Sequence, residues 1–262
     1  MRIHTIYFPP DRQTPCVFPT KPETLPQAIS DLGLQGHQPV IILLGGEIDK
    51  KHAAVTQQAI QTISKTAQNL GAVILCGGTN MGIMSEIGHT RRRNHHNFPL
   101  VGIAPEALVT WPRGPKSTKF LWWGIERWPL EPQYSHFILV PGNQFGDEAP
   151  WIYDAATLLS EGHKAVTILI NGGDVSRKSI ELSLANDLPV IVLSHTGRLA
   201  DELARQPERD KSFTVVPANS ELQIAQAVQT AVLVHEPVPA NVDQRNVNTG
   251  SIRVPKNGSK MK

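Results

Sequence analysis

From residue 73 the chain reads Val73-Ile74-Leu75-Cys76-Gly77-Gly78-Thr79-Asn80-Met81-Gly82, a short apolar run that stops at a pair of glycines. An uninterrupted apolar run of this length is typical of a strand buried on both faces, as in a parallel sheet. Glycines just past such a strand let main-chain N–H groups approach a ligand where the next helix begins, and phosphate binds well there. The stretch therefore predicts a strand, a ligand-binding turn and a helix.

The same pattern occurs at three further places. Apolar runs at residues 40–44, 165–170 and 190–193 lead into Gly45-Gly46, Asn171-Gly172-Gly173-Asp174 and Thr196-Gly197-Arg198. Helical periodicity separates these runs, which predicts an α/β fold: a Rossmann-like, doubly wound, mainly parallel sheet with helices on both faces. Open sheets of this kind bind ligands at the carboxyl ends of their strands. We therefore expect a crevice for a phosphorylated, nucleotide-like molecule.

The composition limits the classes of partner and the cellular compartments that can be expected. The formal charge of +2 gives no global field that would attract nucleic acid or a membrane, and 40% hydrophobic residues suffice for a core. Two cysteines fit a reducing compartment. No apolar stretch approaches the roughly 20 residues of a membrane helix, and the start lacks the apolar segment of a secretory signal. A soluble, cytoplasmic protein is expected.

The chain divides into three parts by composition. Residues 1–38 are predicted to hold one strand, at 3–8, followed by a proline-rich lead-in. Residues 39–236 carry the alternating pattern and form the ligand-binding domain. Residues 237–262 are rich in Asn, Pro, Val and Lys without periodicity, and we expect a disordered tail.

The predicted ligand-binding residues all follow predicted strands. They are Gly45, Gly46, Gly77, Gly78, Thr79, Asn80, Gly82, Gly142, Asn171, Gly172, Gly173, Asp174, Thr196, Gly197 and Arg198. Neither the Gly-x-Gly-x-x-Gly dinucleotide motif nor the P-loop ending Gly-Lys-Ser/Thr occurs in these turns, which counts against ordinary NAD dehydrogenases and NTPases. No catalytic residue, metal or cofactor is assigned.

Two of these side chains have competing interpretations. Asp174 could accept hydrogen bonds from a ribose diol, or it could cap the helix that follows. Arg198 suits bidentate contact with a pyrophosphate, or it could form a surface salt bridge with Asp201 or Glu202. Similarly, Asp147 and Glu148 favour a helix N-terminus electrostatically, and a metal site built on this pair is the weaker alternative.

The segment 105–135 combines aromatic and basic residues. It contains Trp111, Trp122, Trp123 and Trp128 with Arg113, Lys116, Lys119 and Arg127 between them. Such a composition could stack on a base, as in single-strand DNA binders, or it could form a lid or an oligomer contact. Because the segment follows a strand that ends at the crevice, a lid or an interface is preferred.

Four blocks, in the same order, resemble the amino-terminal cytoplasmic region of TRPM-type cation channels. They lie at residues 76–84, 100–105, 130–140 and 196–201. The resemblance identifies the chain as a free-standing prokaryotic member of the SLOG superfamily, which also includes DprA and the LOG-type lysine decarboxylase-like proteins. It implies a Rossmann-like fold and the sensing or processing of nucleotide-derived ligands, among them ADP-ribose-like molecules. Only the resemblance, and no feature of the sequence itself, suggests a homo-oligomer such as a dimer.

LOG-type proteins hydrolyse cytokinin nucleotides with a Pro-Gly-Gly-x-Gly-Thr-x-x-Glu segment. The matching stretch here is residues 171–179, in which the carboxylate position falls on Lys178 or Ser179. Neither side chain can stabilise an oxocarbenium-like centre as a carboxylate does. The sequence therefore favours a sensor that binds a nucleotide derivative such as ADP-ribose. The alternatives are an N-glycosidase that uses Glu181, Asp174 or Glu148, and a DprA-like single-strand DNA partner, which the near-neutral charge disfavours.

Overall fold

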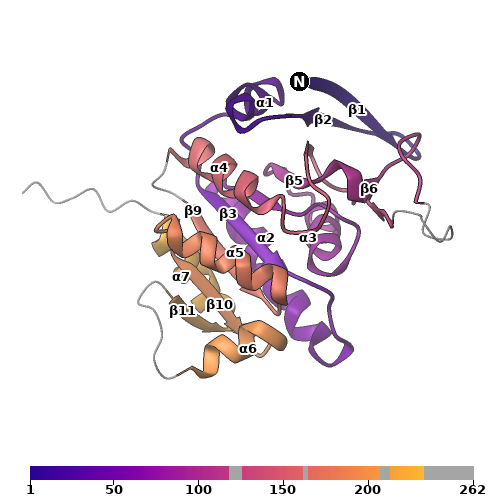
Figure 1. Cartoon of the computed structure of the whole chain (residues 1–262). Helices are drawn as coiled ribbons and strands as arrows, with labels where there is room; N and C mark the ends of the chain where they lie inside the picture. Colours follow the sequence, from indigo (N-terminus) through magenta and orange to yellow (C-terminus); the bar gives the residue numbers. More distant parts are fainter. Residues whose placement is uncertain (118–125, 162–164, 207–212, 233–262) are drawn as a thin grey trace, which may run out of the picture.

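The computed structural model describes residues 1–117, 126–161, 165–206 and 213–232 (Figure 1). The strands are β1 (Arg2–Phe8), β2 (Arg12–Phe18), β3 (Val40–Gly45), β4 (Val73–Cys76), β5 (Leu100–Pro105), β6 (Val109–Thr110), β7 (Trp128–Pro129), β8 (His136–Val140), β9 (Ala165–Ile170), β10 (Val190–Ser194) and β11 (Phe213–Pro217). The helices are α1 (Leu25–Asp31), α2 (Ala53–Leu70), α3 (Gly82–Arg93), α4 (Ala149–Ser160), α5 (Asp174–Ala185), α6 (Arg198–Arg205) and α7 (Glu221–Val232).

Nine strands form one sheet in the order β1-β2-β8-β5-β4-β3-β9-β10-β11. The outermost pair, β1 and β2, is antiparallel, and the other neighbouring pairs are parallel. The N-terminal hairpin lies at one end of the sheet and β11 at the other (Figure 1). The remaining strands, β6 and β7, form a separate short pair.

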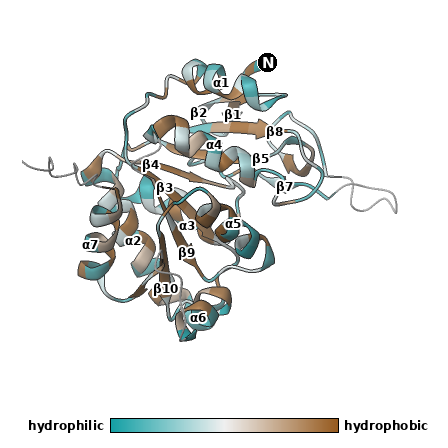
Figure 2. Cartoon of the chain, turned by 60° about the vertical axis from the view of Figure 1, so that its left-hand side comes forward, coloured by the Kyte–Doolittle hydropathy of each residue, from teal (hydrophilic) through white to brown (hydrophobic). Residues whose placement is uncertain are grey.

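Helices cover both faces of the sheet. Helices α2, α3 and α7 pack on one face, where the core includes Ile41, Leu43 and Ile60. Helices α1, α4, α5 and α6 pack on the other, where the core includes Ile42 and Leu44. Alternate residues of β3 thus point to opposite cores, and its apolar run is buried on both faces, as the brown strands between helices in Figure 2 show. The doubly wound, Rossmann-like α/β prediction is confirmed.

Helix α2 shows how the sequence sets an element. Ala59, Ile60, Ile63 and Ala67 recur on one side of the helix and are fully buried. Gly71 then adopts a left-handed conformation at φ 61°, and the N–H of the next residue donates to the Ala67 carbonyl. Gly71 therefore ends the helix.

The N-terminal region contains more structure than the sequence predicted. The stretch expected to be a lead-in holds β2 and α1, and Pro9-Pro10 forms the turn of a hairpin. The prolines here argued against a strand, because proline is usually found outside the interior of a sheet. Pro15 is tolerated because it comes just before Cys16 and Val17, the two residues that pair with β8. The boundary at residue 38 stays a prediction, although the hairpin belongs to the same sheet.

Two other expectations concern the chain as a whole. The predicted disordered tail, 237–262, lies outside the described residues. Among the residues that the structure does describe, none of the helices combines the length and the apolar character needed to cross a membrane.

Candidate ligand-binding site

The sheet topology creates a crevice between β3 and β9, which are neighbours at the centre of the sheet. Helix α2 leads from β3 to β4 over one face, whereas α5 leads from β9 to β10 over the other. Because the two connections diverge, space remains between them at the carboxyl ends of the strands. The fold therefore places a crevice at the carboxyl ends of β3 and β9.

A cavity of about 520 Å³ occupies this crevice. Of the predicted site residues, the following line it: Gly45, Gly46, Gly77, Thr79, Gly173, Asp174 and Arg198. They come from the tips of β3, β4 and β9 and from the starts of α5 and α6, which are far apart in the sequence. These residues thus converge on one cavity, and their role in ligand binding stays a prediction.

Arg198 lies between the tips of β3 and β9. A β-carbon built on Gly46 would lie 3.0 Å from Arg198 Nη1, and one built on Gly173 would lie 2.5 Å from Nη2. Glycine at these positions leaves the space that the guanidinium occupies. Side chains there would push the guanidinium away from the cavity.

The predicted alternative for Arg198, a surface salt bridge, is absent from the described part of the chain. Asp201 Oδ1 instead accepts a hydrogen bond from His195 N at 2.6 Å, and Glu202 pairs with Arg177 at 2.7 Å. Both acids therefore have other partners. The Arg198 side chain is exposed and lines the cavity.

The N-terminus of α5 faces the same cavity. Gly173 is the N-cap residue, and Asp174, Val175 and Ser176 form the first turn and line the cavity. The amides of a first helical turn have no partner inside the helix, and the helix dipole adds partial positive charge. Among the described residues no side chain caps this helix; its N-cap is Gly173, so Asp174 does not have the capping role considered for it. Free amides beside a guanidinium suit a phosphate group.

Asn171 and Thr196 do not line the cavity. Their hydrogen bonds hold the tips of neighbouring strands together. Asn171 Oδ1 accepts hydrogen bonds from Gly46 N, at 2.8 Å, and from Gly172 N. Its Nδ2 donates to the Glu47 carbonyl at 3.0 Å, and its N–H donates to Thr196 Oγ1 at 2.8 Å. Thr196 Oγ1 in turn donates to the Leu193 carbonyl at 2.7 Å. These buried groups fix the positions of the tips of β3, β9 and β10.

The remaining predicted residues lie outside the cavity lining. A β-carbon on Gly78 would lie 2.7 Å from Gly102 Cα, and one on Gly82 would lie 2.1 Å from the Gly46 oxygen. These two glycines therefore serve close backbone packing. Those left over, Asn80, Gly142, Gly172 and Gly197, also fall outside the lining.

Among the described residues, one cation and several acids line the cavity. Arg198 provides the positive charge, whereas Glu47, Asp174 and Glu148 provide carboxyl groups. Burial raises the pKa of Glu148, whose side chain is nearly enclosed, and a hydrogen bond from Gly146 N acts in the opposite direction. In the described ranges no cluster of three or more His, Cys, Asp or Glu side chains is arranged to hold a metal ion.

A family model described as "SLOG in TRPM, prokaryote" matches residues 38–239, which is most of the chain. The chain belongs to this family. A curated relative is the transient receptor potential cation channel subfamily M member 2 of Rattus norvegicus, 26% identical over 171 residues that cover 54% of this chain. The match spans 11% of the channel's length.

The solved structure of the protein TM1055 is similar to this SLOG domain in fold. The TM-score is 0.52 at 16% sequence identity, and the match covers 74% of this chain and 99% of that chain. At this level of identity the similarity concerns the fold alone.

The LOG-type catalytic segment is altered in this SLOG domain, and the structure shows where its residues lie. Ser179 lines the cavity and Lys178 is exposed outside it. Glu181, considered as a replacement carboxylate, is also exposed and does not line the cavity. Asp174 and Glu148 are the candidate carboxylates that do reach the cavity.

Sequence reasoning missed most of the apolar lining. It includes Met81, Met84, Trp128, Phe145 and Ile152. Met84 both packs on the core and borders the cavity. Trp128 lines the cavity, whereas Trp122 and Trp123 lie outside the described residues. A lid or interface role for this segment stays a prediction. Trp111 instead packs against Phe18, with ring centroids 6.0 Å apart.

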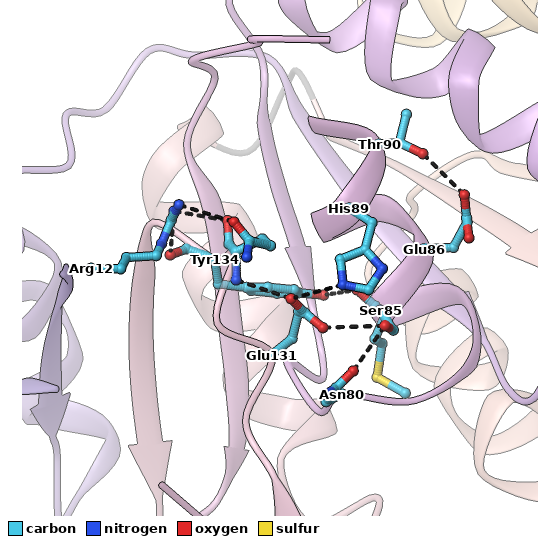
Figure 3. Close-up of polar contacts among 10 residues, drawn as sticks. Arg12, Asn80, Ser85, Glu86, His89, Thr90, Glu131 and Tyr134 are labelled. Atoms are coloured by element: carbon cyan, nitrogen blue, oxygen red, sulfur yellow. Dashed lines mark hydrogen bonds and ion pairs between the residues drawn. The ribbon is translucent and has the colours of Figure 1, made fainter. Parts of the chain in front are cut away.

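Several residues of the segment 130–140 belong to a buried polar network. Glu131 is fully buried and accepts hydrogen bonds from Ser85 Oγ at 3.2 Å and Gln133 N at 3.0 Å (Figure 3). His89 Nε2 lies 3.7 Å from Glu131 Oε1, the oxygen that also accepts from Gln133 N. Tyr134 Oη donates to the Met84 carbonyl at 3.1 Å. The network ties the start of α3, which borders the cavity, to this segment. Burial raises the pKa of Glu131.

Proposed function

We propose that this SLOG domain binds a phosphorylated, nucleotide-derived ligand of the ADP-ribose type without turning it over. The observation that carries the proposal is the convergence of the Arg198 guanidinium, between Gly46 and Gly173, with the free amides at the start of α5. An arginine and a helix N-terminus together provide donors that match a phosphate group.

The rest of the cavity fits the other parts of such a ligand. Trp128, Phe145 and Met81 offer apolar and aromatic surface for a base. Acidic side chains nearby offer acceptors for ribose hydroxyls. A single arginine among several acids favours anchoring through one phosphate rather than through a chain of phosphates. Family membership supports a nucleotide-related role, because LOG-type relatives act on nucleotides.

Binding without hydrolysis is favoured by the altered LOG-type segment. Its carboxylate position holds Lys178 or Ser179, and neither can stabilise an oxocarbenium-like centre. An N-glycosidase would have to use Asp174 or Glu148 instead, from different elements of the fold.

Calorimetric titration with ADP-ribose, AMP, ribose 5-phosphate and inorganic phosphate tests the proposal. We expect at least one nucleotide derivative to bind with a dissociation constant below about 1 mM, and more tightly than phosphate alone. Chromatography of AMP after incubation with the protein should show no released adenine. Absence of binding across the panel contradicts the proposal, and released adenine would establish the glycosidase instead.

A further inference from the structure

One acid in the cavity wall is buried without a cation beside it. Glu148 is 7% exposed and lines the same cavity as Arg198 and the start of α5. It comes from the turn between β8 and α4, so it approaches the cavity from a different element than either of these groups. Among the described residues no lysine, arginine or histidine forms an ion pair with it.

The chain holds this carboxyl group in a fixed position. Gly146 N donates to Glu148 Oε2 at 2.7 Å, and Glu148 is the N-cap residue of α4. Asp147, next to it, secures the turn by accepting from Asn143 N and Gln144 N. One oxygen of Glu148 is thereby used internally. The N–H of Glu148 itself also donates to this carboxyl group. A carboxylate has about four lone-pair sites, so it can still accept a hydrogen bond from a ligand in the cavity.

Burying an ionisable group without a charged partner costs free energy, whether the group stays charged or takes up a proton. Residues of this kind occur preferentially at functional sites. Ile152, one turn further along α4, is buried and lines the same cavity beside Glu148. A ligand group that donates a hydrogen bond would give the buried carboxyl group a further partner.

We propose that Glu148 selects the ligand by accepting a hydrogen bond from an O–H or N–H of its nucleoside part. The inference rests on the proposed function and adds an orientation to it: the phosphate lies at Arg198 and α5, and the donor lies at Glu148. A second phosphate is disfavoured at Glu148, because a buried carboxylate repels an anion. The donor is either the ribose diol or the exocyclic amino group of the base.

Titration calorimetry with three nucleotides tests this assignment on the wild type, Glu148→Ala and Glu148→Gln. The ligands are AMP, 2′-deoxy-AMP, in which the diol is broken, and purine riboside 5′-monophosphate, which lacks the amino group. In the wild type we expect one analogue to bind roughly 10-fold more weakly than AMP. In Glu148→Ala we expect AMP itself to weaken by a similar factor, so that this analogue and AMP become equal.

Two controls separate selection from general damage. Inorganic phosphate should bind Glu148→Ala no more weakly than the wild type, because its proposed contacts are with Arg198 and the start of α5 rather than with Glu148. Glu181→Gln changes an exposed acid on α5 outside the cavity and should alter nothing. The midpoint of thermal unfolding shows which variants are folded, and Glu148→Gln keeps both the volume and an oxygen acceptor for Gly146 N.

The possible failures can be told apart. If the wild type binds neither AMP nor phosphate, the proposed function and this inference both fall. If AMP binds but the Glu148 variants bind it equally well, the inference alone is overturned. Equal binding of all three nucleotides by the wild type also overturns it, even where neither variant folds.

Discussion

Replacing Arg198 with alanine is expected to weaken AMP binding about 30-fold, which corresponds to about 2 kcal/mol of charge-assisted hydrogen bonding. The guanidinium lies against Gly46 and Gly173 beside the amides at the start of α5, so a bound phosphate loses the one cationic partner that the described residues place in the cavity. Calorimetry with AMP measures the change. Arg198→Lys should recover only part of the affinity, because an ammonium group cannot make the paired contact of a guanidinium.

The stability of Arg198→Ala should stay close to that of the wild type. The side chain is exposed, and neither Asp201 nor Glu202 pairs with it. Arg177→Ala is the matched control, because Arg177 is an exposed arginine paired with Glu202 outside the cavity. AMP binding should be unchanged in this control. Equal losses in the two variants would show that net charge, rather than the position of Arg198, governs binding.

Replacing Gly82 with alanine is expected to destabilise the fold by roughly 3 kcal/mol or more. The new β-carbon would lie 2.1 Å from the Gly46 oxygen, and φ at this position is 49°, where side chains are strained. The contact joins the start of α3 to the tip of β3, so relief of the clash would move both. The midpoint of urea unfolding measures the loss.

Gly71→Ala provides the matched control for Gly82→Ala. Gly71 has a similar φ of 61°, but a β-carbon there would meet nothing within 4 Å. We expect a cost of about 1 kcal/mol from backbone strain alone. The difference between the two variants therefore isolates the close approach of α3 to β3. If both lose the same stability, the tight contact at Gly82 carries no energetic weight.

The sheet could be predicted from the sequence because its central strands are buried on both faces. Runs such as residues 40–44 are uninterrupted and apolar, and each ends in glycines, so strand and turn are signalled together. β2 could not be found in this way. It is short of apolar residues, contains Pro15 and gains its place by pairing with β1 and β8.

The site could be predicted only in part, because a residue type does not reveal which neighbour it faces. Gly46, Gly173 and Arg198 were predicted separately, and the structure shows why they belong together. Asn171 was predicted as a ligand contact from its position after β9, but its amide joins the tips of two strands. Glu148 was only a weak candidate, because its burial depends on how α4 packs.

The most direct test of a phosphate site at the meeting of β3 and β9 is a nitrogen-15 NMR titration with AMP. We predict the largest shifts at the amides of Gly173, Asp174, Val175 and Ser176 and at the side-chain Nε of Arg198. Shifts concentrated elsewhere, for example around Asn80 and Glu86, which line a separate cavity at the start of α3, would contradict this placement. So would the absence of any shift at millimolar AMP.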